Sequence, residues 1–194
     1  MRYVALLRGV NVGGAAKVEM PRLKALFEDL GLASVRTYIN SGNVLFDSRA
    51  TDRTRLTRRI EKAIEAEFGF PVRVLLRAGD EVARLVKAIP RTWVNDQQMR
   101  CDVWFLWPEA DSRATLREIP VQPELEDLRY APGALLWRID RKDAGRSRVG
   151  KVVGTKLYRN LTIRNVNTVR KLGELLSTGP ETAGGPRPRS PRPG

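Results

Sequence analysis

Two short polar segments of this 194-residue chain carry residue types that could hold a ligand. One is RGVNVGG at residues 8–14, and the other is NSGN at residues 40–43. Glycine lets the backbone adopt positive φ and approach a ligand closely, so several N–H groups of such loops can converge on an anion. The candidate ligand-binding residues are Arg8, Asn11, Gly13, Gly14, Asn40, Ser41, Gly42 and Asn43.

The glycine loop matches neither common phosphate-binding pattern. Its glycines are spaced G-x-x-x-G-G rather than G-x-G-x-x-G, and no G-K-[ST] sequence follows. Tight turns and hairpins also use glycine and asparagine for purely steric reasons. A ligand-binding role and a steric role are therefore both open for these two segments.

The chain contains no histidine and one cysteine, Cys101. Ser-His-Asp triads, Cys-His dyads and His-ligated metal sites are thereby excluded. No Asp/Glu cluster resembles a metal site, so we expect neither metal nor other cofactor and assign no catalytic residue. A lone cysteine forms no internal disulfide, which predicts a reducing, cytoplasmic location. Cys101 itself is expected to be a buried strand residue rather than a nucleophile.

Basic residues are concentrated toward the C-terminal end. The sequence has 35 Lys and Arg against 22 Asp and Glu, a formal net charge of +13. Residues 141–171 contain ten basic residues and one acidic residue, so nine of the thirteen excess charges lie there. Compositional bias alone would scatter the excess, so this concentration favours a polyanionic partner. The candidate phosphate-binding residues are Arg146, Arg148, Lys151, Lys156, Arg164, Asn165, Asn167 and Lys171.

Apolar periodicity predicts the elements that position these residues. The first half alternates in the order βαββαβ, with strands at 3–8, 35–39, 44–46 and 72–76 and helices at 21–30 and 53–68. This order is the ferredoxin-like pattern. In that pattern the first strand ends where the second turns into the third, so the two polar segments are expected to meet.

The second half shows a related β-α-β-β-α order, which indicates an internal duplication without a residue-level repeat. Its strands are expected at 99–107, 127–130 and 135–139, and helices at 80–89, 110–119, 149–159 and 166–176. One of Asn165, Asn167 and Thr168 is expected to cap the last helix. Strand alternation predicts that Trp107 and Trp137 are core residues, whereas Glu124 and Glu126 are expected to be surface charges.

The predicted fold class is therefore α+β, with two tandem ferredoxin-like halves, each of βαββαβ type, packed as one compact unit. The expected boundaries are 1–78 for the first half, 79–177 for the second, and 178–194 for a disordered tail rich in Pro and Arg. The apolar runs are far shorter than the ~20 residues that cross a bilayer, so no membrane partner is expected.

Three segments resemble a known family: YVALLRGVNVGG, TYINSGNVLF and TIRNVNTVRKL. They are similar to the bacterial family catalogued as domain of unknown function 1697, and the resemblance extends from Met1 to about Leu176. It implies two tandem ferredoxin-like halves, but no established activity and no catalytic residues. The family's typical aromatic between the two asparagines of the last segment is Val166 here. If that aromatic stacks on a ligand, this chain lacks the contact; if it only packs, valine is an ordinary replacement.

Three functions fit these observations. The first is a binding protein for nucleic acid, RNA more than DNA, which the charge favours. Ferredoxin-like sheets also commonly present a platform for bases, although no RNP-like aromatic strand is present. The second is an enzyme or sensor for a small phosphorylated metabolite or nucleotide held between residues 8–14 and 40–43. The third is a protein–protein module with an acidic partner. No oligomeric state is predicted.

Overall fold

Two four-stranded antiparallel sheets form the framework of the protein, which the computed structural model describes over residues 1–12 and 16–178. The first sheet has the order β2-β3-β1-β4, with strands β1 (Arg2–Leu7), β2 (Ala33–Tyr38), β3 (Asn43–Asp47) and β4 (Val74–Ala78). The second has the equivalent order β6-β7-β5-β8, with strands β5 (Met99–Leu106), β6 (Glu126–Ala131), β7 (Ala134–Asp140) and β8 (Leu161–Asn165). The predicted α+β class with two ferredoxin-like halves is confirmed. The tail predicted at 178–194 lies outside the described residues apart from residue 178.

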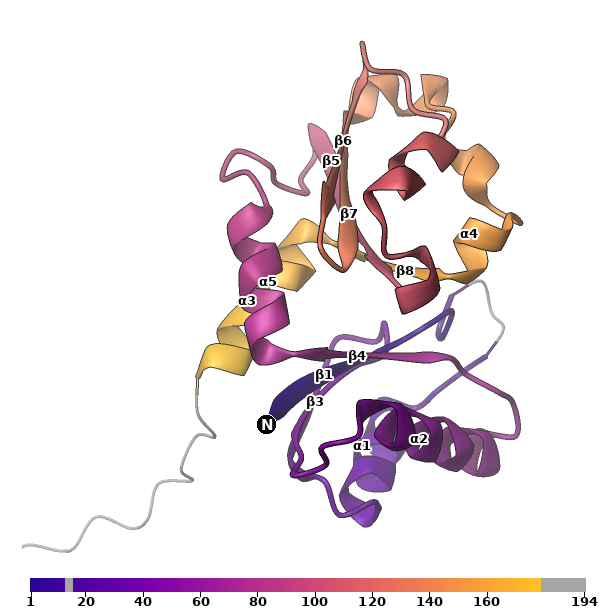
Figure 1. Cartoon of the computed structure of the whole chain (residues 1–194), viewed down its shortest axis with the longest axis vertical. Helices are drawn as coiled ribbons and strands as arrows, with labels where there is room; N and C mark the ends of the chain where they lie inside the picture. Colours follow the sequence, from indigo (N-terminus) through magenta and orange to yellow (C-terminus); the bar gives the residue numbers. More distant parts are fainter. Residues whose placement is uncertain (13–15, 179–194) are drawn as a thin grey trace, which may run out of the picture.

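Two amphipathic helices cover one face of the first sheet (Figure 1). They are α1 (Met20–Asp29) and α2 (Arg53–Phe68), both close to their predicted positions. The Asp52 carboxylate accepts a hydrogen bond from the Arg55 N–H and so begins α2, and Gly69, at a φ of 79°, ends it. Their apolar stripes pack against the sheet, and Phe27 and Ile60 within them are fully buried.

The opposite face of the first sheet shares a core with the second half. The helices α3 (Gly79–Ala88) and α5 (Val166–Ser177) follow the last strand of each half and pack against each other. Leu6 and Leu75 from the first sheet join Val103 and Leu136 from the second in this core. Val166, which stands where the family's aromatic is typical, is fully buried in it, so in this chain the position serves packing.

The outer face of the second sheet is covered by short turns rather than by the two helices predicted at 110–119 and 149–159, and that prediction was wrong. The segments are η1 (Pro108–Ala110), η2 (Arg113–Glu118), η3 (Arg141–Arg146), η4 (Val149–Val152) and the one-turn helix α4 (Lys156–Arg159). Gly154, at a φ of 86°, and Thr155, whose hydroxyl accepts from the Tyr158 N–H, separate η4 from α4. A left-handed glycine followed by a new N-cap ends one helical segment and starts another.

Sequence periodicity missed strand β8. The reason is that Thr162 and Arg164 are buried while Ile163 between them is only half-buried, which inverts the usual pattern of apolar residues inside. Trp107, Trp137 and Cys101 are buried, as predicted. No helix in the described ranges is long and apolar enough to cross a bilayer.

The buried guanidinium of Arg164 joins the second half to the first. Its Nη2 donates to the carbonyl oxygens of Leu7, at 2.9 Å, and Gly42, at 3.4 Å, and its Nε donates to Asn43 Oδ1 at 2.6 Å. Its Nη1 donates to Ile163 O within its own strand. Burial lowers the pKa of Arg164 to about 10, which leaves the group charged at neutral pH.

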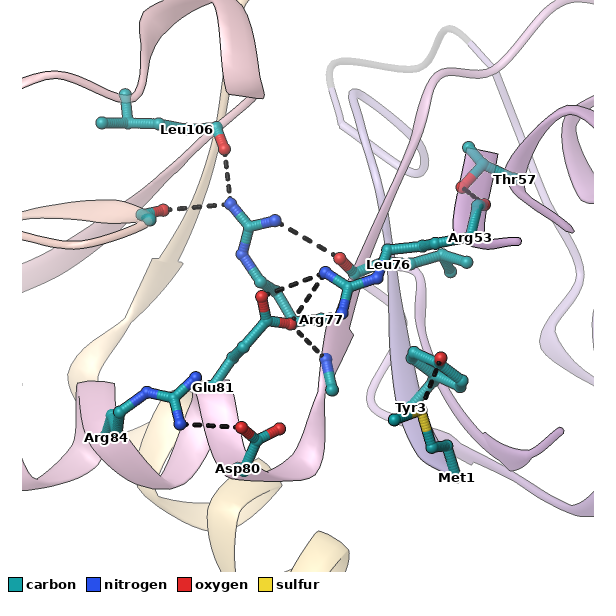
Figure 2. Close-up of polar contacts among 12 residues, drawn as sticks. Met1, Tyr3, Arg53, Thr57, Leu76, Arg77, Asp80, Glu81, Arg84 and Leu106 are labelled. Carbon is teal, nitrogen blue, oxygen red and sulfur yellow. Dashed lines mark hydrogen bonds and ion pairs between the residues drawn. The ribbon is translucent and has the colours of Figure 1, made fainter. Parts of the chain in front are cut away.

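Arg77 makes the equivalent contact in the other direction (Figure 2). It occupies the fourth position of β4, as Arg164 does in β8. Its Nη2 donates to Leu106 O at 2.5 Å and to Gly133 O at 3.2 Å, and its Nη1 reaches Leu76 O at 3.3 Å. Leu106 ends β5 as Leu7 ends β1, and Gly133 lies in the β6–β7 turn as Gly42 lies in the β2–β3 turn.

These paired contacts supply the residue-level repeat that the sequence conceals. The N–H of Leu7 donates to Gly42 O at 2.8 Å, and the N–H of Leu106 donates to Gly133 O at 2.9 Å. Both glycines have positive φ, 69° and 89°. The arginine of each half therefore donates hydrogen bonds to the equivalent two backbone carbonyls of the other half.

Replacing Arg164 with methionine should destabilise the protein by at least about 3 kcal/mol, because it removes charged hydrogen bonds and leaves buried carbonyl groups without donors. Arg77→Met, with fewer acceptors, should cost about 1–3 kcal/mol. Urea unfolding monitored by tryptophan fluorescence measures both values. The exposed Arg148→Met is the control and should stay within about 0.5 kcal/mol of the natural chain. An Arg164→Met chain as stable as this control would contradict the structural role.

The thiol of Cys101 should resist alkylation in the folded protein. Its side chain is fully buried, and this burial raises the pKa of the thiol to about 11. Only the thiolate is nucleophilic, so iodoacetamide at about pH 8 should modify the native protein far more slowly than the guanidinium-unfolded chain. Mass spectrometry measures the modified fraction over time, and equal rates in the two states would contradict the prediction.

Candidate nucleic-acid interface

The glycine loop and the asparagine turn meet in space, as their topology predicted. Asn11, whose φ is +56°, donates from Nδ2 to Asn40 O at 2.8 Å and to Val18 O at 2.9 Å. Its Oδ1 accepts from the Val18 N–H at 2.8 Å. The Asn11 side chain thus links the start of its loop to Val18, at the end of that loop, and to the turn at Asn40. Gly13 and Gly14 lie outside the described residues.

Most polar groups of these two segments are engaged within the fold. Asn43 is buried, and its Nδ2 donates to Tyr38 O and to the Ser41 hydroxyl. A Cβ on Gly42 would lie 2.6 Å from a methyl carbon of Val10, which no real contact allows, so glycine is sterically required there. The steric interpretation therefore accounts for Ser41, Gly42 and Asn43.

Arg8 points away from the loop toward the second half. Its Nε donates to Leu161 O at 3.1 Å and its Nη2 donates to Tyr158 O at 3.0 Å, with the guanidinium 5.2 Å from the Tyr158 ring centre. A cavity of about 590 Å³ lies beside the loop, lined by residues that include Asn11, Lys17 and Asn40. Arg8 is not among the residues that line it, and the cation in its lining is Lys17.

The eight residues predicted to contact phosphate fall into two groups. Four are engaged in the fold around β8 and α5: Arg164 holds the halves together, Asn165 caps α5, Asn167 exchanges hydrogen bonds with the backbone of Asn95, and Lys171 lies 2.9 Å from Glu174. Arg164 is buried, and its donors contact backbone carbonyls, Asn43 Oδ1 and the Thr162 hydroxyl; phosphate binding by this residue stays a prediction. The N-cap of the last helix is thereby assigned to Asn165.

The other four, Arg146, Arg148, Lys151 and Lys156, lie exposed on the segment that covers the second sheet. Arg146 pairs with Asp143 at 3.1 Å. Within the described chain no ion pair involves the following exposed cations of this segment: Arg141, Lys142, Arg148, Lys151, Lys156 and Arg159. We call residues 141–159 the basic segment.

A buried carboxylate anchors the basic segment. Glu126, predicted to be a surface charge, is 5% exposed, and that prediction was wrong. Its Oε1 accepts from Trp137 Nε1 at 3.1 Å and from the Ser147 hydroxyl at 2.5 Å, while Oε2 accepts from the Gln122 N–H. Ser147 stands between Arg146 and Arg148, so this contact fixes the backbone that carries both cations. Glu124 is exposed, as predicted.

A cleft of about 710 Å³ that sequence analysis did not anticipate lies at the junction of the halves, along β4. One wall is α2, and the other is formed by Trp107, Pro108 and Glu109. Arg73 lies at one end, with its guanidinium 4.4 Å from the Trp107 ring centre and its Nη1 2.6 Å from Arg159 O. Arg77 lines this cleft and also an adjoining cavity of about 340 Å³.

The chemistry available at these surfaces is anion binding by cations and backbone donors. In the described ranges, no three His, Cys, Asp or Glu side chains are grouped so that they could hold a metal ion. Burial lowers the pKa of Arg77, but the group stays charged at neutral pH and contributes positive charge to the cleft floor.

Comparisons with known proteins agree with the repeated architecture. The structure is similar to that of the conserved bacterial protein SP0830 from Streptococcus pneumoniae, with a TM-score of 0.77 and 28% sequence identity over 91% of this chain and 98% of the other. No curated protein matches the chain. The model of the family described as "Protein of unknown function (DUF1697)" matches residues 1–137. The chain therefore belongs to the DUF1697 family.

Proposed function

We propose that this protein binds nucleic acid through the basic segment. The observation that carries the proposal is the set of six exposed cations without an ion-pair partner within the described chain, on a segment fixed by Glu126. Lys and Arg side chains that are not neutralised within the protein can displace counterions from phosphates, which is the main source of sequence-independent affinity for nucleic acids.

The contacts proposed are to phosphates rather than to bases. Both faces of each sheet lie within hydrophobic cores, so neither sheet offers the stacking platform on which the preference for RNA over DNA was based. The four tryptophans are also buried. Binding through phosphates alone depends little on sequence, and single-stranded RNA is the first probe with single-stranded DNA as its comparison.

Fluorescence anisotropy with a labelled single-stranded RNA tests the proposal. Binding should weaken as salt rises over ~50–300 mM, with a slope of about −0.7 in log K per phosphate contact. Replacing Arg148 and Lys151 together by glutamate should weaken binding at least tenfold, by about 1.4 kcal/mol or more, and should flatten the salt slope.

The matched control is the pair Lys87→Glu and Arg91→Glu, which changes the net charge equally at exposed positions outside the basic segment, on α3 and just after it. This control should retain most of the affinity. An equal loss in both double variants would mean that total charge, rather than the basic segment, governs binding. No binding of RNA or DNA at the lowest salt would refute the proposal.

A further inference from the structure

The two arginine contacts differ in what surrounds them. At Arg164, Asn43 follows Gly42 and supplies a side-chain oxygen to Nε at 2.6 Å. At the equivalent place in the second half, Ala134 follows Gly133 and has no oxygen to offer. Within the described chain Arg77 Nε consequently forms no hydrogen bond, and its side chain lies along the two cavities at the junction. The Arg164 contact is thus completed by a side-chain acceptor, whereas the equivalent Arg77 contact borders a cleft.

The open cleft has the size and place of a small-molecule site. Its volume of about 710 Å³ falls within the range of about 300–1,000 Å³ typical of ligand pockets, which form preferentially between domains. Its floor includes the apolar residues Val74 and Leu76, with Pro108 on one wall. An apolar floor with a few charged groups at the rim suits a ligand that has an organic body and an ionised end.

Cations available to such a ligand lie along the rim. Arg58 and Lys62 are exposed, stand one turn apart on α2, and form no ion pair within the described chain. Of the three carboxylates in the lining, Glu61 is engaged, because its Oε1 accepts from the Val74 N–H at 2.8 Å. The lining holds five cations and three carboxylates, and one of the cations, Arg53, is paired with Glu81 at 3.0 Å, so a small excess of positive charge remains in the cleft.

A planar surface is available in the same cleft. The Arg73 guanidinium is stacked over Trp107 at 4.4 Å and is held by Arg159 O and by Asn160 Oδ1 at 3.1 Å. The Arg73 side chain is exposed, whereas Trp107 beneath it is buried. A guanidinium fixed in this way can stack on an aromatic ring or a base, as arginine does at many nucleotide-binding sites.

We propose that this cleft binds a small phosphorylated molecule with a planar ring, of which a nucleotide is the simplest example. Arg58 and Lys62 bind the phosphate, and the ring stacks on Arg73. Arg77 at the floor adds a fixed positive charge. The phosphate-binding residues of this site come from α2 in the first half, and its contact with the basic segment is the hydrogen bond from Arg73 to Arg159 O.

Isothermal titration calorimetry with AMP, adenosine and pyrophosphate tests the site on the full chain. AMP should bind, pyrophosphate should bind more weakly, and adenosine should not bind measurably. The double variant Arg58→Glu and Lys62→Glu should weaken AMP binding at least tenfold with unchanged thermal unfolding. Arg73→Ala should reduce the preference for AMP over pyrophosphate.

Two other double variants separate this site from the proposed nucleic-acid surface. The Arg148/Lys151 and Lys87/Arg91 variants should both keep their affinity for AMP, whatever the first does to RNA binding. Failure of AMP and pyrophosphate to bind would overturn the small-molecule site and leave the RNA result unaffected. A loss of AMP affinity that is equal in all three double variants would overturn it as well.

Discussion

Two buried guanidinium groups hold this protein together, and the rest of the architecture depends on their exchange between the halves. Each arginine leaves the last strand of one half and ends on the first strand and hairpin turn of the other. Backbone carbonyl groups at the ends of β1 and β5 thereby receive their donors from the opposite half. Buried carbonyls need such partners, so each half is complete only in the presence of the other. The shared apolar core between the sheets, with α3 packed on α5, has the same consequence.

The sequence segments typical of the family meet at this junction. Arg164 of the last segment contacts Asn43 of the second and Leu7 of the first, so all three converge on one hydrogen-bonded group. Arg8 and Asn11 add further contacts of the same kind. The residues that line the cleft and the exposed cations of the basic segment belong to none of these segments. A distinctive local sequence can therefore mark an internal contact as readily as a functional one.

Local patterns predicted the first half well, because its helices have clear apolar stripes with a cap and a glycine at their ends. They failed where polar or charged side chains are buried, against the usual preference of these residue types for solvent. Buried Thr162 and Arg164 concealed β8, and a buried carboxylate at Glu126 appeared to be a surface charge. The meeting of the two loops followed from topology alone. The cleft could not be predicted, because it forms only where Trp107 lies against β4. These two segments are far apart in the sequence, and no local pattern shows that they meet.

The exchange of arginines has the contact symmetry of an isologous dimer, in which one surface meets a second copy of itself. In such a dimer a single residue change alters both sites at once, so an asparagine that satisfies one arginine must also satisfy the other. Joining the copies in one chain removes this coupling. Asn43 then secures Arg164, while Ala134, at the corresponding place, leaves room beside Arg77. Because the two halves are joined in one chain, the Arg164 contact can maintain the architecture while the surroundings of Arg77 can change independently.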